Sequence, residues 1–368
     1  MSALLPEDRR WLDAAVRYAT PFQGTTAENP AVAALVVSPA RQTVLARAVT
    51  GRGGRPHAAA EAIAAAGFDA AGSTLYLTLE PCNHWGRTPP CVAAIIRSGI
   101  MRVVIGVTDP DPRTAGVSLA QLESAGIETI LADHAPSKAL HAGHIMRHTA
   151  GRPHVTAMLA MSSDGMIGRA GEGYERHVGP AARQWMDMLR ARADAVMVGG
   201  ATARMDDPAL AVTLPGLGAE TPLRVVLAGA AGIDRKVNLI GGFSGYRTAI
   251  IAETSVSIDA PVSIEVMRVA GADGRPDLGE AMKTLAKKGI QNLLVEPGQR
   301  LAAALLDAGL VDRFVLLTGT GVLGPEAVPA CPEGTFTDVL AASGFIGHER
   351  EALGGDNLMI YERAARPH

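Results

Sequence analysis

The sequence predicts two consecutive α/β domains, at residues 1–150 and 151–368. Three observations support this prediction. The chain has 368 residues, more than a single domain usually contains. Segments of helical periodicity alternate with short apolar segments typical of strands along the whole chain. Between the two halves, a helical stretch ends in Ala150-Gly151-Arg152-Pro153, which is the best candidate for a domain boundary.

The first half is predicted to form a small three-layer domain. An amphipathic helix is expected at 11–18, because Trp11, Leu12 and Val16 share one face. An alanine-rich helix is expected at 57–66, ending at Gly67 as its C-cap. The other expected elements are strands at 32–37, 43–49, 74–79, 101–106 and 128–131, helices at 90–98 and 119–123, and a helical stretch at 132–152 whose histidines, His141, His144 and His148, we interpret as an exposed polar face.

The second half is predicted to contain strands at 155–161, 195–198, 223–227, 248–251, 292–295 and 313–317. No G-x-G-x-x-G sequence opens a helix after a strand, so the Rossmann fingerprint is absent. The pair Gly199-Gly200 follows a predicted strand and has two interpretations. Its amides could approach a phosphate, or it could form a plain tight turn.

Composition excludes several functional classes. The formal net charge is −3, so the chain has no basic surface field for nucleic acid or a membrane. Its apolar runs are too short to span a bilayer, and the N-terminal residues have no apolar signal-peptide core. Three cysteines do not make a disulfide framework. We therefore expect a cytoplasmic enzyme that acts on small molecules, and we expect it to be a homodimer.

The strongest chemical signal is His57 together with Cys82 and Cys91, which flank a Gly-Arg-Thr-Pro-Pro turn. One imidazole and two thiolates leave the fourth position of a Zn²⁺ ion open, as a hydrolytic zinc site requires. Two alternatives remain. His84 could close the site as a fourth ligand of a structural zinc, or the three residues could be a buried histidine and two free cysteines.

Several motifs resemble one family, the bifunctional deaminase–reductases of riboflavin biosynthesis. The first half matches it at Asn29-Pro30, Gly54 to Ala58, Thr78 to Cys82, His84 to Cys91 and Asp109 to Arg113. The second half matches it at Ser162-x-Asp164-Gly165, Asp206-Asp207-Pro208-x-Leu210 and Leu294-Val295-Glu296, among other short segments. These motifs occur in the order and with the spacing of the family, and together they extend over nearly the whole chain.

The resemblance implies a cytidine-deaminase-like three-layer α/β/α domain followed by a dihydrofolate-reductase-like α/β domain. It implies Zn²⁺-dependent hydrolytic deamination of a phosphoribosylated diaminopyrimidine, then NADPH-dependent reduction of the ribose to a ribityl chain. The residues it implies for NADPH are Ala160, Thr202, Asp206 and Gly298, and those it implies for substrates are Asn29, Arg190, Leu210 and Glu296. The Asp206 cluster has an alternative interpretation as a helix N-cap or turn.

One departure from the family affects the deaminase chemistry. Zinc deaminases carry His-Ala-Glu, and the glutamate moves protons between water and base without binding the metal. Here the sequence is His57-Ala58-Ala59-Ala60-Glu61, so Ala59 occupies the position of the proton shuttle. Glu61 is a possible substitute, because residues four apart share a helix face. It lies two residues further along, however, which is about 3 Å along a helix axis.

Other departures fall in the reductase half. Met158, Arg176 and Thr213 replace a lysine, a tryptophan and an arginine that the family pattern leads us to expect, and Pro297 replaces a glycine. Fewer basic groups weaken a phosphate site, and proline removes a backbone amide. The alternative hypothesis is therefore a degenerate or redirected paralogue that binds zinc and a nucleotide-like ligand without the full activity.

Overall fold

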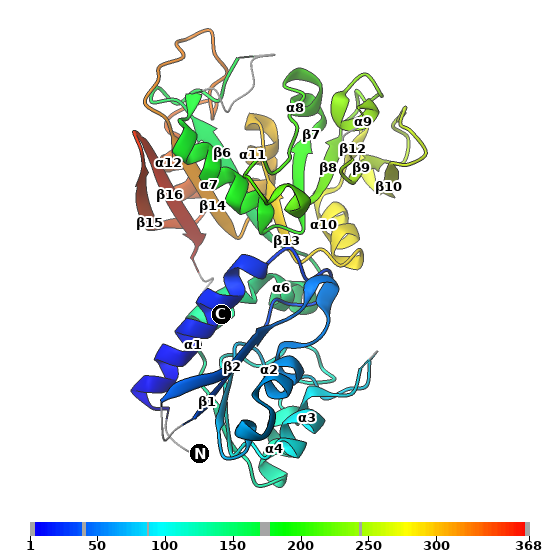
Figure 1. Ribbon diagram of the computed structural model, residues 1–368. Coiled ribbons are helices and arrows are strands. Elements are labelled where there is room, and N and C mark those ends of the chain that lie inside the picture. The colour runs from blue at the N-terminus through cyan, green and yellow to red at the C-terminus, as the bar shows by residue number, and fades with distance from the viewer. Residues whose placement is uncertain (1–3, 39–41, 87, 170–176, 243–244, 365–368) are drawn as a thin grey trace. The chain divides into compact units, whose positions relative to one another are not determined.

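The computed structural model describes residues 4–38, 42–86, 88–169, 177–242 and 245–364 (Figure 1). The chain divides into two compact units, Met1–Gly151 and Arg152–His368. Each unit has its own sheet, with helices packed on it. No helix within the described ranges is long and apolar enough to cross a membrane.

The first unit is built on a five-stranded sheet of order β2-β1-β3-β4-β5. Strand β1 is antiparallel to β2 and β3, whereas β3, β4 and β5 are parallel to one another. The elements are α1 (Pro6–Ala19), β1 (Ala33–Ser38), β2 (Thr43–Val49), α2 (Ala58–Ala66), β3 (Thr74–Leu77), α3 (Cys91–Arg97), β4 (Arg102–Ile105), α4 (Val117–Ser124), β5 (Glu128–Leu131), α5 (Ala135–Leu140) and α6 (Ala142–Ala150).

This sheet has a buried apolar layer on each face, because side chains alternate along a strand. On one face, Ala34 and Val36 of β1 pack with residues of α2, α3 and α4. On the other, Leu35 and Val37 of the same strand pack with α1 and α5. The result is the predicted three-layer arrangement, with α2 and α3 on the same face of the sheet.

Helix α1 is attached to the sheet by a buried charged cluster. The fully buried Asp8 accepts two hydrogen bonds from the Arg102 guanidinium, each at 2.8 Å, and one from the Tyr76 hydroxyl at 2.9 Å. Burial by itself raises the pKa of Asp8, but the bonds from Arg102, the Leu5 amide and Tyr76 lower it below the ordinary value.

We expect Asp8→Asn to lower the free energy of unfolding by about 3 kcal/mol, because it leaves Arg102 without its buried counter-charge. Chemical denaturation measures this loss, and Glu7→Gln on the exposed face of α1 is the control, with an expected change below about 0.5 kcal/mol. Since the pKa of Asp8 is lowered by folding, its contribution is present above about pH 4 and is lost as the pH falls. Equal stability of both variants would contradict this role.

The second unit contains a nine-stranded sheet of order β10-β9-β8-β7-β13-β6-β14-β16-β15, which is parallel from β10 to β14. Its elements are β6 (His154–Met161), α7 (Pro180–Ala191), β7 (Ala195–Gly199), α8 (Gly200–Met205), β8 (Leu223–Ala228), α9 (Asn238–Gly241), β9 (Thr248–Glu253), β10 (Glu265–Val269), β11 (Gly271–Ala272), β12 (Arg275–Pro276), α10 (Leu278–Lys287), β13 (Asn292–Val295), α11 (Gln299–Asp307), β14 (Arg313–Thr318), α12 (Phe336–Ala342), β15 (Phe345–Leu353) and β16 (Asp356–Arg363).

Helices also cover both faces of the second sheet. Along β6, Val155, Ala157 and Leu159 pack toward α10, α11 and α12. Met158 and Ala160 of the same strand face the core formed with α7, α8 and α9. The antiparallel pair β15–β16 continues the sheet beyond β14, and the sequence analysis did not identify it. Seven consecutive residues of β15 are exposed, so no apolar alternation marks this strand.

The prediction that the histidines of 132–152 form an exposed polar face is wrong for two of the three. His141 and His144 are buried, whereas His148 is exposed. His141 Nε2 lies 3.0 Å from the Thr78 hydroxyl. His144 Nε2 lies 2.9 Å from a carboxylate oxygen of Asp109. Each imidazole has a polar partner inside the unit, which is why a polar helix face can be buried here.

Candidate metal centre and nucleotide cavity

Helix starts position two of the three predicted zinc ligands. His57 is the N-cap residue of α2, with extended backbone angles, so its ring lies at the end of the helix rather than on its side. Cys91 is the first residue of α3, directly after Pro90. Cys82 lies in the loop that follows β3, and the Cys91 amide donates a hydrogen bond to its sulfur at 3.4 Å.

The three side chains converge as a metal centre requires. His57 Nδ1 lies 3.4 Å from the sulfur of Cys82 and 3.4 Å from that of Cys91. All three ligand atoms lie within 4.8 Å of one another. Zinc bonds of about 2.0–2.3 Å place tetrahedral ligand atoms about 3.5 Å apart, so the donor set and its geometry fit Zn²⁺. Among the described residues this group has three members and does not include His84.

The two thiols have different electrostatic environments. The pKa of Cys82 is lowered to about 4, first by the hydrogen bond with the Cys91 thiol and further by His57 and the Cys91 amide. The pKa of Cys91 is raised, because it faces the Cys82 sulfur and is buried. A bound divalent cation favours the thiolate of both residues.

A cavity of about 510 Å³ opens beside the three ligands. Asn29, predicted to bind substrate, and Ala59, at the shuttle position, both line it. Glu61 is exposed and is not among its lining residues. The carboxylate that the sequence offers as a substitute therefore lies outside the lining of this cavity, and a methyl group occupies the shuttle position.

The position of Asn29 depends on Gly54. This glycine has a φ of +90°, and a Cβ built on it would lie 2.1 Å from Asn29 Nδ2. Any larger residue would combine a left-handed backbone strain with a clash against the amide. The Gly54-Arg55-Pro56-His57 segment thus brings the metal ligand and Asn29 to the same cavity.

The polar residues that line this cavity include Glu80, Asp109 and His144. The Glu80 carboxylate accepts hydrogen bonds from the amides of Asp109 and Gly116. Asp109 in turn lies 2.9 Å from His144 Nε2. The place of His144 in this cavity was not predicted, because its partner Asp109 lies 35 residues away in the sequence.

The second unit has a cavity of about 1190 Å³ that includes residues at the carboxyl ends of β7 and β8. Open α/β sheets bind ligands at this end of their strands. The predicted nucleotide contacts Thr202, Asp206 and Gly298 line the cavity, as do Gly199 and Gly200. A Cβ on Gly298 would lie 3.2 Å from the Thr202 hydroxyl, so two predicted contacts are neighbours. Four arginines in the lining supply positive charge for phosphates: Arg169, Arg204, Arg275 and Arg300.

The structure distinguishes the alternatives for the Gly199-Gly200 pair and for the Asp206 cluster. Gly199-Gly200 is neither a plain turn nor a loop, because α8 begins at Gly200. Asp206 is the C-cap residue of α8 rather than an N-cap. Asp207 has a φ of +41°, and its carboxylate accepts a hydrogen bond from the amide of Asn238, the first residue of α9.

The other predicted reductase residues lie outside the lining of this cavity. Ala160 is buried in β6, and its carbonyl lies 3.1 Å from His177 Nε2. Leu210 is buried with a φ of +51°. Arg190 donates two hydrogen bonds to the buried Glu296, at 2.6 and 2.9 Å. Burial raises the pKa of Glu296, whereas the two hydrogen bonds from the permanently protonated Arg190 favour the ionised carboxylate.

Three of the four departures from the family in the reductase half lie within the described residues. The Thr213 amide donates a hydrogen bond of 2.8 Å to the Asp187 carboxylate, which also accepts one of 2.9 Å from Arg190. Thr213 is therefore linked to the buried ion pair of Arg190 and Glu296. Met158 is buried in the core of β6, and Pro297 is buried between β13 and α11. Arg176 lies outside the described residues.

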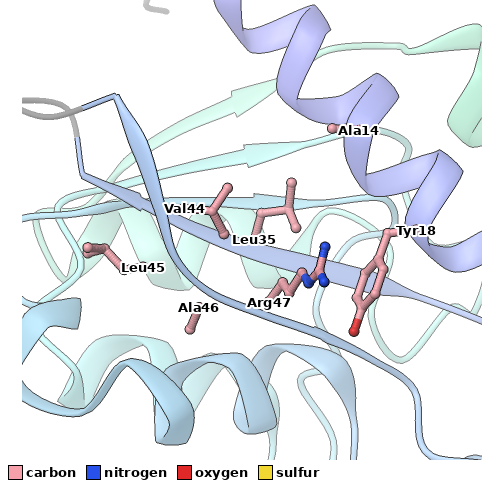
Figure 2. Close-up of a pocket in the computed structure, with 7 residues that line it drawn as sticks. All are labelled: Ala14, Tyr18, Leu35, Val44, Leu45, Ala46 and Arg47. Carbon is pink, nitrogen blue, oxygen red and sulfur yellow. The ribbon is translucent and has the colours of Figure 1, made fainter.

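A shallower cavity of about 380 Å³ in the first unit has a different character. Figure 2 shows the Arg47 guanidinium beside the ring of Tyr18. The central carbon of the guanidinium lies 4.8 Å from the ring centroid. The rest of its lining is apolar, from α1, β1 and β2. It contains no metal ligands and no acid–base pair, so we assign no chemistry to it.

Comparison with known proteins identifies the family. A model of the RibD C-terminal domain matches residues 153–348, and a model of the cytidine and deoxycytidylate deaminase zinc-binding region matches residues 5–107. The riboflavin biosynthesis protein RibD of Escherichia coli is 32% identical over 88% of this chain and 91% of its own length. The chain belongs to the RibD family. RibD of Haemophilus influenzae is 31% identical over 96% of this chain and 97% of its own length.

Solved RibD structures agree with this assignment. Acinetobacter baumannii RibD aligns with a TM-score of 0.83 and 27% identity, covering 98% of this chain and 99% of that one. A deaminase/reductase of Thermotoga maritima aligns with a TM-score of 0.82 and 27% identity, covering 97% and 99%. The predicted fold class is confirmed. Like RibD, the chain is a bifunctional deaminase and reductase of riboflavin biosynthesis that uses Zn²⁺ and NADPH.

Proposed function

We propose that this chain catalyses two consecutive reactions. The first is hydrolytic deamination of a phosphoribosylated diaminopyrimidine, at His57, Cys82 and Cys91. The second is NADPH-dependent reduction of the ribose of the product to a ribityl chain. The observation that carries this proposal is the three-ligand centre beside a cavity, with a second cavity at the strand ends of the other unit. The T. maritima protein bears the names of both activities.

Within the deaminase site, Zn²⁺ would polarise the attacking water and lower its pKa. Asn29 lines the cavity, and we propose that it hydrogen-bonds the pyrimidine there. The family's proton shuttle is missing at Ala59, so we propose that turnover is depressed while zinc and substrate binding are retained. Within the reductase site, we propose that Ala160, Thr202, Asp206 and Gly298 contact NADPH, and that Arg190, Leu210 and Glu296 lie toward the substrate. A homodimer remains a prediction.

Two assays on the purified full chain test the proposal. One measures ammonia release from the diaminopyrimidine ribotide, and the other measures NADPH oxidation with the deaminated ribosylaminouracil. We expect slow ammonia release and substrate-dependent NADPH oxidation. Loss of both activities would favour the alternative, a redirected paralogue that binds zinc and a nucleotide-like ligand.

We expect the chain to bind NADPH at least about 10-fold more tightly than NADH, because the extra phosphate gains charge-assisted hydrogen bonds from the arginines lining the larger cavity. Calorimetric titration of the full chain with each cofactor measures the difference, and repeating it at high salt should reduce it. No binding of NADPH at millimolar concentration would mean that Pro297 and Thr213 mark a site that has lost its cofactor.

A further inference from the structure

One buried imidazole faces the deaminase cavity without an assigned role. His144, on α6, lines the same cavity as the three metal ligands and Ala59. Its side chain is 8% exposed. Its Nδ1 atom is buried and has no hydrogen-bond partner among the described residues. A buried polar nitrogen without a partner costs free energy, so this atom would gain from a hydrogen bond to a water or a substrate group.

The hydrogen bonds around His144 determine which nitrogen carries the proton. Nε2 lies 2.9 Å from the Asp109 carboxylate, which can only accept when it is ionised. Nε2 is therefore the protonated nitrogen, and Nδ1 keeps its lone pair as a base. The Asp109 amide donates a hydrogen bond to the Glu80 carboxylate, and Asp109 Oδ1 accepts one from the Asp111 amide. These two bonds hold the Asp109 carboxylate in place. A carboxylate that fixes a histidine tautomer is the arrangement of hydrolase triads.

We propose that His144 Nδ1 is the proton-transfer group of this deaminase site, in place of the glutamate that is absent at position 59. The inference rests on the proposed deaminase function and names a residue for its chemistry. Ala59 and His144 line one cavity from different elements, α2 and α6, so both border the space that a substrate of this site would fill.

The proposed proton transfers balance as follows. As the water oxygen bonds to the ring carbon that bears the amino group, one water proton moves to His144 Nδ1 and then to the adjacent ring nitrogen. The new hydroxyl then gives its proton to Nδ1, which passes it to the amino group. The carbon–nitrogen bond breaks, ammonia leaves, and a carbonyl remains on the ring. His144 ends in its starting state, and Asp109 stabilises the transient imidazolium.

The test is a double-mutant cycle with four full-length chains: the unmodified chain, Ala59→Glu, His144→Gln and the double variant. Glutamine keeps a donor toward Asp109 but cannot act as a base. We expect His144→Gln to lower the rate of ammonia release at least about 10-fold in the unmodified background. In the Ala59→Glu background, where a carboxylate takes over, we expect less than about 3-fold.

Further variants guard against a folding artefact. Asp109→Asn should lower turnover in the same background-dependent way, because an amide donor favours the wrong tautomer. Glu61→Ala, on the exposed side of α2, is the matched control and should change turnover less than about 2-fold. Zinc content should be unchanged, and thermal unfolding should show every compared chain to be folded at the assay temperature.

The outcomes are distinguishable. Equal losses in both backgrounds, or no loss in either, would overturn the assignment of His144 and leave the deaminase function standing. Absence of ammonia release from all four chains would overturn the deaminase function and the inference together. A loss confined to the unmodified background would support His144 as the base.

Discussion

Replacing Ala59 with glutamate is expected to raise deaminase turnover by about 10²–10⁴-fold, the contribution that a positioned general acid–base typically makes. In the barrier this corresponds to about 3–5 kcal/mol. Ala59 is buried and lines the cavity, so a carboxylate introduced there points toward the reaction centre. Because His144 already transfers protons in our proposal, the gain should fall at the lower end of the range. Ammonia release by the purified variants measures it.

The same variant should not change the metal. Zinc content and the KM for the pyrimidine should stay within about 2-fold of the unmodified chain, because the shuttle is not a ligand. Normal turnover of the unmodified chain, together with its loss in Glu61→Ala, would contradict this prediction. Glu61 would then be the base, and α2 would have to rotate to bring it into the cavity.

Purified protein should carry about one zinc per chain, and Cys91→Ala should remove both the metal and ammonia release. The two remaining ligands, His57 and Cys82, cannot hold the ion with comparable affinity, and Zn²⁺ is needed to activate the water. NADPH oxidation should continue, because the reductase cavity is lined entirely by residues of the second unit. Metal analysis and the two assays measure these outcomes.

The chain offers a matched control for this experiment. Cys331 is a free thiol in the second unit that donates a hydrogen bond to the Gly334 carbonyl, and Cys331→Ala should leave zinc content unchanged. Protein prepared without chelators that contains no zinc would contradict the metal assignment. So would a Cys91→Ala variant that keeps both its zinc and its activity.

The convergence of the three proposed zinc ligands could be predicted because their chemistry is local in the sequence. The two cysteines flank one turn, and the histidine directly precedes a helix. The turn keeps the two thiols close together, so the fold has to bring only one further side chain, the imidazole, to them. The alternation of helices and strands likewise followed from periodicity. His144 could not be predicted, since a helix that is polar on one face indicates exposure unless the partners that bury it are known. Those partners, Asp109 and the cavity, come from distant parts of the sequence.

The reductase half was less predictable for a related reason. Arg190 and Glu296 are 106 residues apart in the chain, and nothing local indicates that they form an ion pair. Their pairing changes what each can do, because a carboxylate that binds a guanidinium has fewer lone pairs for a substrate. Strand β15 was missed because its exposed, charged residues have no apolar period.

The strand order of the second sheet has a consequence for how the chain folds during synthesis. In the first unit, β1 to β5 find their neighbours within one short stretch of chain. In the second, β6 is made first but pairs with β13 at 292–295 and β14 at 313–318. During synthesis, the apolar strand β6 therefore stays unpaired until more than a hundred further residues have been added to the chain. Chaperone binding and aggregation of nascent chains should concentrate on β6, whereas the deaminase unit can already be folded by then.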